Sequence, residues 1–323
     1  MNTLFYLAVA MLAGLLMTRV TRLVKLPNVT AYLIAGVLIG PCVFKLVPEA
    51  ELNNFSIITE AALGFIAFSI GDQFKLSSLK ALGKSALIIT ALESLGAAVV
   101  VMSITLLLGF DPIVCVMLGA LSASTAPAAT LLIVRQYKTS GPLTDMLLPV
   151  VAADDATGLI AYSICVNIAL GMVNHEPFSV TNTILLPLVD IVLALLVGAL
   201  IGFALALSNK YFRSHTNRMS LAIAAVFLGV GVADHFGLSN LLLCMAMGAV
   251  YVNLRDDAER VLGCIDDWTY PLFMLFFVIS GAELNLATLP KVGLIGMSIS
   301  LQDLVESSLV LGLVELLLVN HQL

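Results

Sequence analysis

Two adjacent aspartates, Asp154 and Asp155, lie inside an apolar stretch that reads LLPVVAADDATGLIAYSICV (residues 147–166). A charged side chain at the centre of a bilayer costs about 2.5–3.5 kcal/mol on insertion scales. Neighbouring residues of a helix point about 100° apart, so at least one carboxylate must face a wet cavity or another polar group. A buried pair that holds either a proton or a cation is sufficient for cation/proton exchange. The alternative is that one aspartate caps a broken helix or forms a structural pair.

The apolar segment before this one carries a polar interruption, in GALSASTAPAATLLIV (residues 119–134). Pro127 removes a backbone donor and disfavours helical geometry at the residue before it. Local unwinding would free carbonyl groups and the hydroxyls of Ser124 and Thr125 for a cation, as discontinuous helices do in secondary transporters. These residues are therefore candidate ligands, with Pro127 as an accessory. The alternative is an ordinary proline kink satisfied by serine and threonine.

Three further carboxylates fall in apolar segments. Glu93, in IITALESLGAAVV, is a possible accessory to the aspartate pair, and a structural role is an equally good interpretation. Glu60 and Asp190 come closer to segment ends, where hydration favours the simpler interpretation of a solvated side chain.

Such residues must be positioned by membrane helices. The chain has 323 residues, of which 60% are hydrophobic and 11% charged, whereas a soluble domain has about 45–50% and about 25%. Apolar windows of about 20 residues recur along its length, which predicts an all-α polytopic membrane protein of ten to twelve helices. We expect the first ten at 3–22, 28–45, 54–73, 83–109, 112–136, 143–172, 181–208, 217–236, 238–254 and 265–282.

Basic residues predict the orientation of these helices. Lys45 and Lys291 fall on one side of the expected membrane. The other side carries Arg19, Arg22, Lys25, Lys75, Lys80, Lys84, Arg135, Lys138, Lys210, Arg213, Arg218, Arg255 and Arg260. The positive-inside rule makes the crowded side cytoplasmic and the N-terminus external. The positive charges follow the first apolar segment, so we expect a retained helix and not a signal peptide.

The sequence shows no motif of an enzyme or of nucleic-acid binding. We find no nucleotide-binding loop, catalytic triad or metal-ligand cluster, and the five cysteines have no redox or ligand spacing. We therefore expect no enzymatic activity, no cofactor and no nucleic-acid partner. The expected partners are the lipid bilayer, protons and a transported monovalent cation.

Several segments in order resemble the bacterial monovalent cation:proton antiporters, the sodium/proton antiporter superfamily with a buried Asp-Asp pair. The resemblance covers residues 1–296 and rests on LPNVTAYLIAGVLIGP (26–41), ITEAALGFIAFSIGDQF (58–74), SASTAPAATLLIVRQYKTSGPLT (122–144), VVAADDATGLIAYSI (150–164) and PLFMLFFVISGAELNLATLPKVGLIG (271–296).

The resemblance implies a homodimer in the inner membrane of a bacterium, with crossed discontinuous helices and an elevator movement. It implies that Thr125 lies at the unwound segment and that Asp155 binds the transported Na⁺ or K⁺. Asp154 matches the neighbouring position, which pairs with a lysine on helix eleven in electrogenic members.

The end of the chain departs from this pattern. No lysine follows Lys291, and residues 297–323 contain several polar residues where a spanning helix is expected, so the second repeat is incomplete. Synonymous codons allow a shifted reading frame of SLQDLVESSLVLGLVEL (residues 300–316) to encode a family-like helix. We therefore predict a membrane domain over 1–296 and a divergent tail over 297–323 that arises from a frameshift; the alternatives are a short natural variant or chance.

The leading functional interpretation is exchange of protons for sodium or potassium. A sodium-coupled organic-anion symporter of related fold is the main alternative, and an inactive truncated relic is another.

Overall fold

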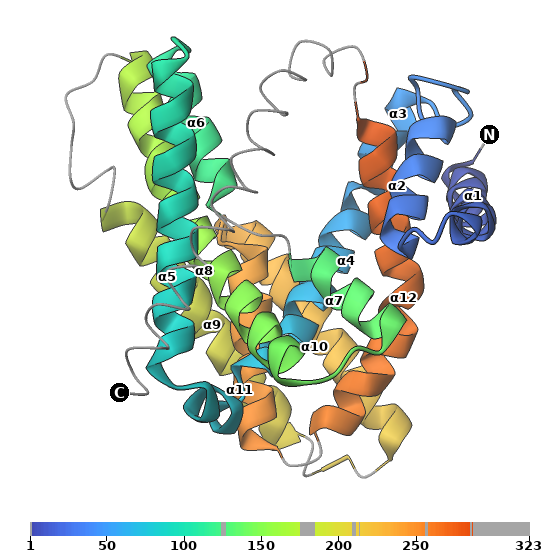
Figure 1. Cartoon of the computed structure of the whole chain (residues 1–323). Coiled ribbons are helices and arrows are strands. Elements are labelled where there is room, and N and C mark those ends of the chain that lie inside the picture. The colour runs from blue at the N-terminus through green and yellow to red at the C-terminus, as the bar shows by residue number, and fades with distance from the viewer. Residues whose placement is uncertain are drawn as a thin grey trace. The chain divides into compact units, whose positions relative to one another are not determined.

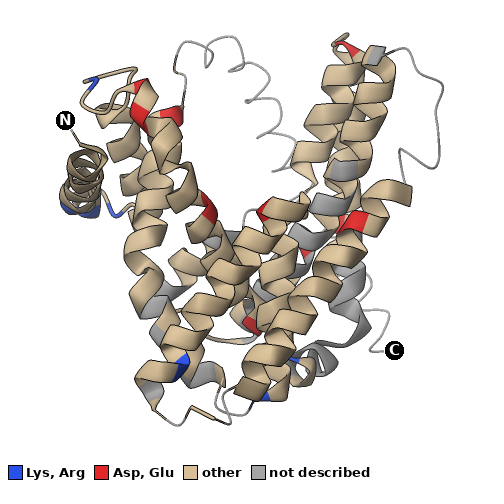
Figure 2. Ribbon diagram, turned by 180° about the vertical axis from the view of Figure 1, so that it is seen from behind, with Lys and Arg blue, Asp and Glu red and all other residues tan. Residues whose placement is uncertain are grey.

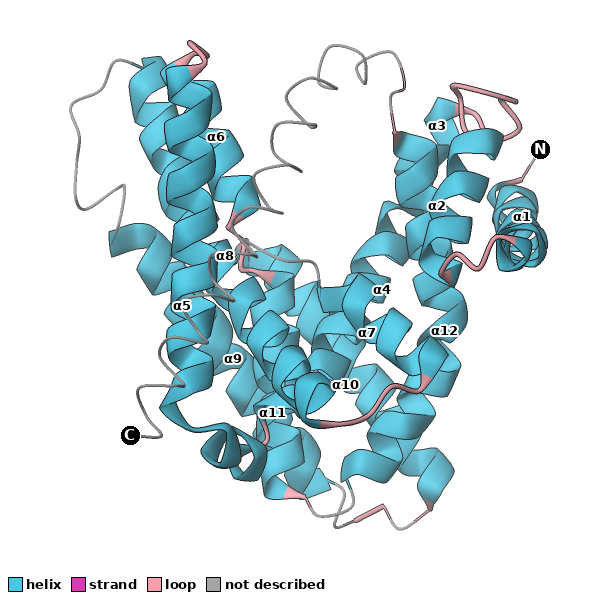
Figure 3. Ribbon diagram, viewed as in Figure 1, coloured by secondary structure: helices cyan, strands magenta, loops and turns pink. Residues whose placement is uncertain are grey.

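The computed structural model consists of helices and the loops that join them, and no strand occurs among its described residues (Figure 3). The structure describes residues 2–123, 127–174, 185–208, 211–212, 214–255, 258–284 and 286. The predicted tail, residues 297–323, lies outside this part.

Each of the ten predicted segments coincides with helix, and the ends differ in several cases. The helices are α1 (Thr3–Leu23), α2 (Asn28–Ile39), α3 (Glu49–Leu52), η1 (Asn53–Phe55), α4 (Ser56–Ile70), η2 (Gly71–Phe74), α5 (Leu76–Leu107), α6 (Pro112–Ser122), α7 (Pro127–Tyr137), α8 (Pro142–Asn174), α9 (Leu186–Ser208), α10 (His215–Phe236), α11 (Asn240–Leu254) and α12 (Ala258–Glu283).

Proline fixes the starts of the three helices that follow one another in the middle of the chain. Pro112, Pro127 and Pro142 are the first residues of α6, α7 and α8. Proline suits this position because its missing N–H would have no intrahelical partner there. At α6 the Asp111 carboxylate also accepts a hydrogen bond from the Ile113 N–H at 2.8 Å, which satisfies one of the free donors at the helix start.

The chain divides into two compact units. The first consists of residues Met1–Leu76, Ala128–Thr139 and Leu193–Ala287. In this unit α2 packs on α1 and α12, and α4 packs on α11 and α12 (Figure 1). Backbones approach closely at glycine: a Cβ on Gly71 would lie 2.6 Å from the Ala249 nitrogen. Large buried side chains such as Phe65, Phe68 and Tyr251 fill its core.

The Asn253 side chain links the end of η2 to the start of α5, and we call this pair of hydrogen bonds the clamp. The Asn253 side chain of α11 accepts from the Leu76 N–H at 2.8 Å and donates to the Phe74 carbonyl at 3.0 Å. The Leu76 N–H is the first donor of α5, and the Phe74 carbonyl lies at the end of η2. Groups at helix ends have no intrahelical partners, so Asn253 supplies partners for both.

The second unit consists of Ser77–Pro127, Ser140–Val192 and Thr288–Leu323. Its described helices are nearly all of α5, with α6, α8 and the start of α9 up to Val192. In this unit α6 packs on α8, and α5 lies beside them in Figure 1. Gly119 of α6 faces α5, and a Cβ added there would lie 2.8 Å from the Ala98 carbonyl oxygen. The contact between α5 and α6 therefore depends on the absence of a side chain at this position.

The helices have the composition of membrane spans. Four helical stretches of the described part are long and apolar enough to cross a membrane: Thr3–Leu23, Glu49–Phe74, Leu186–Ser208 and Thr216–Phe236. Large apolar side chains are also exposed, among them Leu16 at 68% and Leu200 at 68%. Charged residues interrupt the described helices at few positions (Figure 2). Extensive apolar exposure of this kind is expected where lipid replaces water.

Candidate functional site

The predicted helix over residues 112–136 is discontinuous. One half, α6, ends at Ser122, and the other, α7, begins at Pro127. Each half has 11 residues, about 16 Å of helix, whereas a span requires about 20 residues. The end of α6 and the start of α7 agree with the predicted interruption, and the unwound segment itself stays a prediction. Ser124 and Thr125, the candidate ligands, lie in residues 124–126, outside the described part.

The aspartate pair lies within α8, 12 and 13 residues after its first residue, Pro142. The Asp154 side chain is 1% exposed. One turn later the Thr157 hydroxyl donates to the Asp154 carbonyl oxygen at 3.0 Å. The backbone of Asp155 is helical, and its side chain lies outside the described part.

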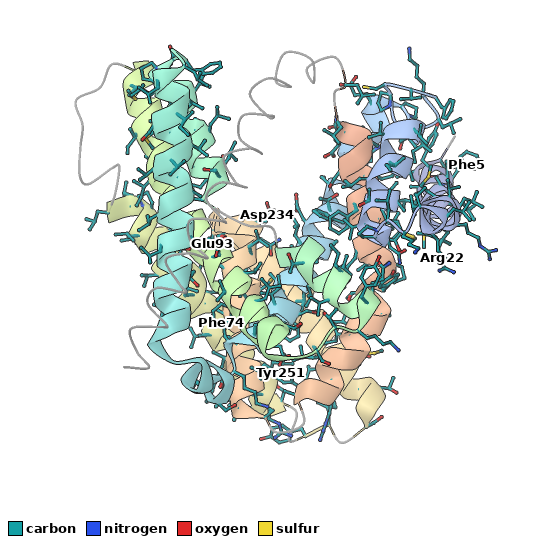
Figure 4. All side chains as sticks on the ribbon, viewed as in Figure 1. Phe5, Arg22, Phe74, Glu93, Asp234 and Tyr251 are labelled. Atoms are coloured by element: carbon teal, nitrogen blue, oxygen red, sulfur yellow. The ribbon has the colours of Figure 1, made fainter. Side chains whose placement is uncertain are left out.

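Glu93 interacts with Asp154. It lies about midway along α5, where Figure 4 labels it, and its side chain is partly buried. The Glu93 carboxyl group is near enough to Asp154 for the two groups to interact electrostatically. Two carboxyl groups from different helices of the second unit therefore influence each other. The accessory role of Glu93 in a cation site stays a prediction.

Sequence reasoning missed the residue next to Glu93. The Ser94 hydroxyl donates a hydrogen bond of 2.7 Å to the carbonyl oxygen of Ala123. Ala123 directly follows the last residue of α6, and Ser94 is 1% exposed. A serine in an apolar helix has no distinctive sequence signal, because its partner depends on how α5 and α6 are aligned.

The remaining acidic candidates are exposed. Glu60 on α4 and Asp190 on α9 both have exposed side chains, as the interpretation of hydrated positions near helix ends requires. Among the described residues, no group of three or more His, Cys, Asp and Glu side chains could hold a metal ion.

The described part of the second unit brings together groups that can bind a cation or a proton. It combines a buried aspartate, a nearby glutamate and the end of α6, where the last carbonyl groups lack helical partners. The carbonyl end of a helix also carries partial negative charge. Oxygen ligands of this kind bind hard cations, and the carboxylates can bind protons instead.

Comparisons with known proteins show the family of the chain. The family model described as "Sodium/hydrogen exchanger, transmembrane" matches residues 7–317. This match includes part of the tail, for which the changed reading frame stays a prediction.

Two curated relatives are antiporters by name. The chain is 23% identical over 261 residues to the ammonium/H⁺ antiporter subunit AmhT of Alkalihalophilus pseudofirmus, covering 78% of this chain and 64% of the relative. It is 23% identical over 322 residues to Na⁺/H⁺ antiporter 1 of Methanocaldococcus jannaschii, covering 93% and 73%. The chain therefore spans less than two thirds of AmhT.

A solved structure has the same fold. The sodium proton antiporter MjNhaP1 from Methanocaldococcus jannaschii at pH 8 matches with a TM-score of 0.72 and 18% identity, over 93% of this chain and 75% of that one. With the family match across nearly the whole sequence, these findings identify the chain as a multi-pass membrane protein that belongs to the sodium/hydrogen exchanger family.

Proposed function

We propose that this protein exchanges protons for a monovalent cation across the membrane. The observation that carries the proposal is the burial of Asp154 in α8, with its electrostatic interaction with Glu93, in a chain of the sodium/hydrogen exchanger family. Buried carboxyl groups in a membrane are costly, and this cost is typical of groups that bind ions or protons.

Within this proposal, Asp155 binds the transported cation and Asp154 supports it. The resemblance of VVAADDATGL to the family motif supports these roles, and Ser124 and Thr125 complete the site from the broken helix. Proton and cation compete for the same carboxylates, so the site releases one when it binds the other.

The setting proposed for this activity is the inner membrane of a bacterium. The distribution of lysine and arginine supports an external N-terminus. The homodimer rests on the family resemblance alone, and chemical cross-linking in native membranes tests it.

Proteoliposomes that contain a pH-sensitive dye test the function directly. Purified protein is expected to release protons from the lumen when Na⁺, K⁺ or NH₄⁺ is added outside, and NH₄⁺ is included because AmhT is named as an ammonium/H⁺ antiporter subunit. Asp155→Asn should abolish this response to the preferred cation.

Two results would contradict the proposal. Uptake of an organic anion with sodium, without proton movement, would identify a symporter. No transport of any of these cations by protein that is monodisperse and folded would identify a chain without exchange activity.

A further inference from the structure

The Ser94 hydroxyl connects the middle of α5 to the point where α6 ends. Its oxygen lies 2.7 Å from the carbonyl oxygen of Ala123 and donates the hydrogen bond. Ser94 is 1% exposed and Ala123 is also 1% exposed, so water does not compete for this bond. The bond joins two helices of the same unit across 29 residues of sequence.

Side chains and the backbone of described residues hold the end of α6. This helix ends at Ser122, and the last carbonyl groups of a helix have no intrahelical partners. The Ala120 carbonyl accepts from the Ala123 N–H, and the Ser122 hydroxyl donates to the Gly119 carbonyl at 2.9 Å. The Ala123 carbonyl accepts from a side chain of another helix, Ser94 of α5.

The position of Ser94 next to Glu93 gives this contact a functional setting. Successive residues of a helix point about 100° apart. Glu93 interacts with Asp154 of α8, and Ser94 donates to the carbonyl after the last residue of α6. The same turn of α5 therefore contacts the acidic site and the broken helix together.

We propose that Ser94 is a positioning residue for cation binding: its hydroxyl holds the Ala123 carbonyl and so fixes the end of α6 against the turn of α5 that carries Glu93. This inference rests on the proposed cation/proton exchange. Loss of the hydroxyl should weaken cation binding, because the carbonyl at the entrance to the break loses the donor that holds it. The maximal rate should change little, because Ser94 carries no proton in the exchange.

Thr105 provides a matched control on the same helix. Its hydroxyl also donates to a carbonyl at 2.7 Å, is fully buried, and lies within α5, but its acceptor is Val101 of α5 itself. Thr105→Val removes a buried hydroxyl whose acceptors, the carbonyls of Val101 and Met102, both lie in α5. The two variants therefore differ mainly in whether the lost hydrogen bond reaches the break.

The test is cation-dependent proton efflux from proteoliposomes of the wild-type chain, Ser94→Ala, Ser94→Thr and Thr105→Val. The energy of one hydrogen bond corresponds to a change of about three- to tenfold in an equilibrium constant. We expect Ser94→Ala to raise the half-saturating cation concentration by about this factor, with the maximal rate within about twofold of wild type on the same grounds. Ser94→Thr keeps the donor and should restore the wild-type value, and Thr105→Val should leave it unchanged.

The outcomes separate the inference from the function on which it rests. A wild-type protein that exchanges no cation overturns both. An active wild type with equal half-saturating concentrations for Ser94→Ala and Thr105→Val overturns the role of Ser94 alone. If Ser94→Ala does not fold, Ser94→Cys keeps the size with a weaker donor, and an unchanged half-saturating concentration in that variant overturns the inference.

Discussion

Gly119→Ala tests whether close contact between α5 and α6 holds the site together. A methyl group at this position would lie 2.8 Å from the Ala98 carbonyl oxygen and 3.1 Å from Cβ of Met102, whereas ordinary contact begins at 3.4 Å. The two backbones would have to separate by about 0.6 Å, and overpacking of this kind costs about 1–3 kcal/mol. Replacing glycine in a helix returns about 0.5–1 kcal/mol.

The net expectation is a loss of about 1 kcal/mol, which corresponds to a fall of about 2–4 °C in the unfolding temperature. Gly171→Ala is the control, because Gly171 lies in α8 of the same unit and a Cβ there meets nothing within 4 Å. This variant should gain stability through helix propensity alone. Both temperatures are measured by intrinsic fluorescence of purified protein in detergent. Equal shifts, or a stabilised Gly119→Ala, would refute the packing between α5 and α6 described above.

Two other substitutions give predictions of distinct kinds. Glu93→Gln removes an ionisable group that interacts electrostatically with Asp154, so the pH profile of exchange in proteoliposomes should move relative to wild type. Glu60→Gln, at an exposed position, should leave the profile in place, and an equal movement in both variants would contradict the role of Glu93. Asn253→Ala removes the clamp at the start of α5 and should lower thermal stability by about 1–2 kcal/mol, measured by thermal unfolding in detergent. Asn54→Ala, which loses one exposed bond to Glu51, is the control, and an equally small effect of both would show that the clamp contributes little.

Most of the fold was predictable, because apolar segments separated by polar links define membrane helices. The break in the middle of the chain was predictable for a similar reason: proline within an apolar run has a local effect on the backbone. The ends of some helices were predicted less well. The second helix was expected to extend to residue 45 and ends at Ile39, followed by Gly40 and Pro41.

Helices with polar ends were also predicted too short. The segment expected from residue 83 begins as α5 at Leu76, and the one expected from residue 265 begins as α12 at Ala258. Both extensions contain serine or charged residues, which lower apolarity without ending a helix. Hydropathy marks the part of a helix that lies in hydrocarbon, so it misses turns that extend beyond it.

The candidate site was predictable in its charges and less so in its contacts. Asp154 and Glu93 were predicted as candidates because carboxylates are rare in apolar helices, and in the structure the two groups interact electrostatically. The hydrogen bond from Ser94 to Ala123 depends on the alignment of two helices, which no local pattern specifies. Such alignment is set by close contacts between helices, like the one that Gly119 makes with Ala98.

The most direct test of the central claim is the half-saturating cation concentration for exchange, measured in proteoliposomes across a series of pH values. If a proton and a cation compete for the same carboxylates, this concentration should rise by about tenfold for each unit by which the pH falls below the value at which the site is half protonated. The maximal rate should remain the same across that range. A half-saturating concentration that does not depend on pH, with a maximal rate that does, would show that protons and cations bind at separate places and would contradict the account.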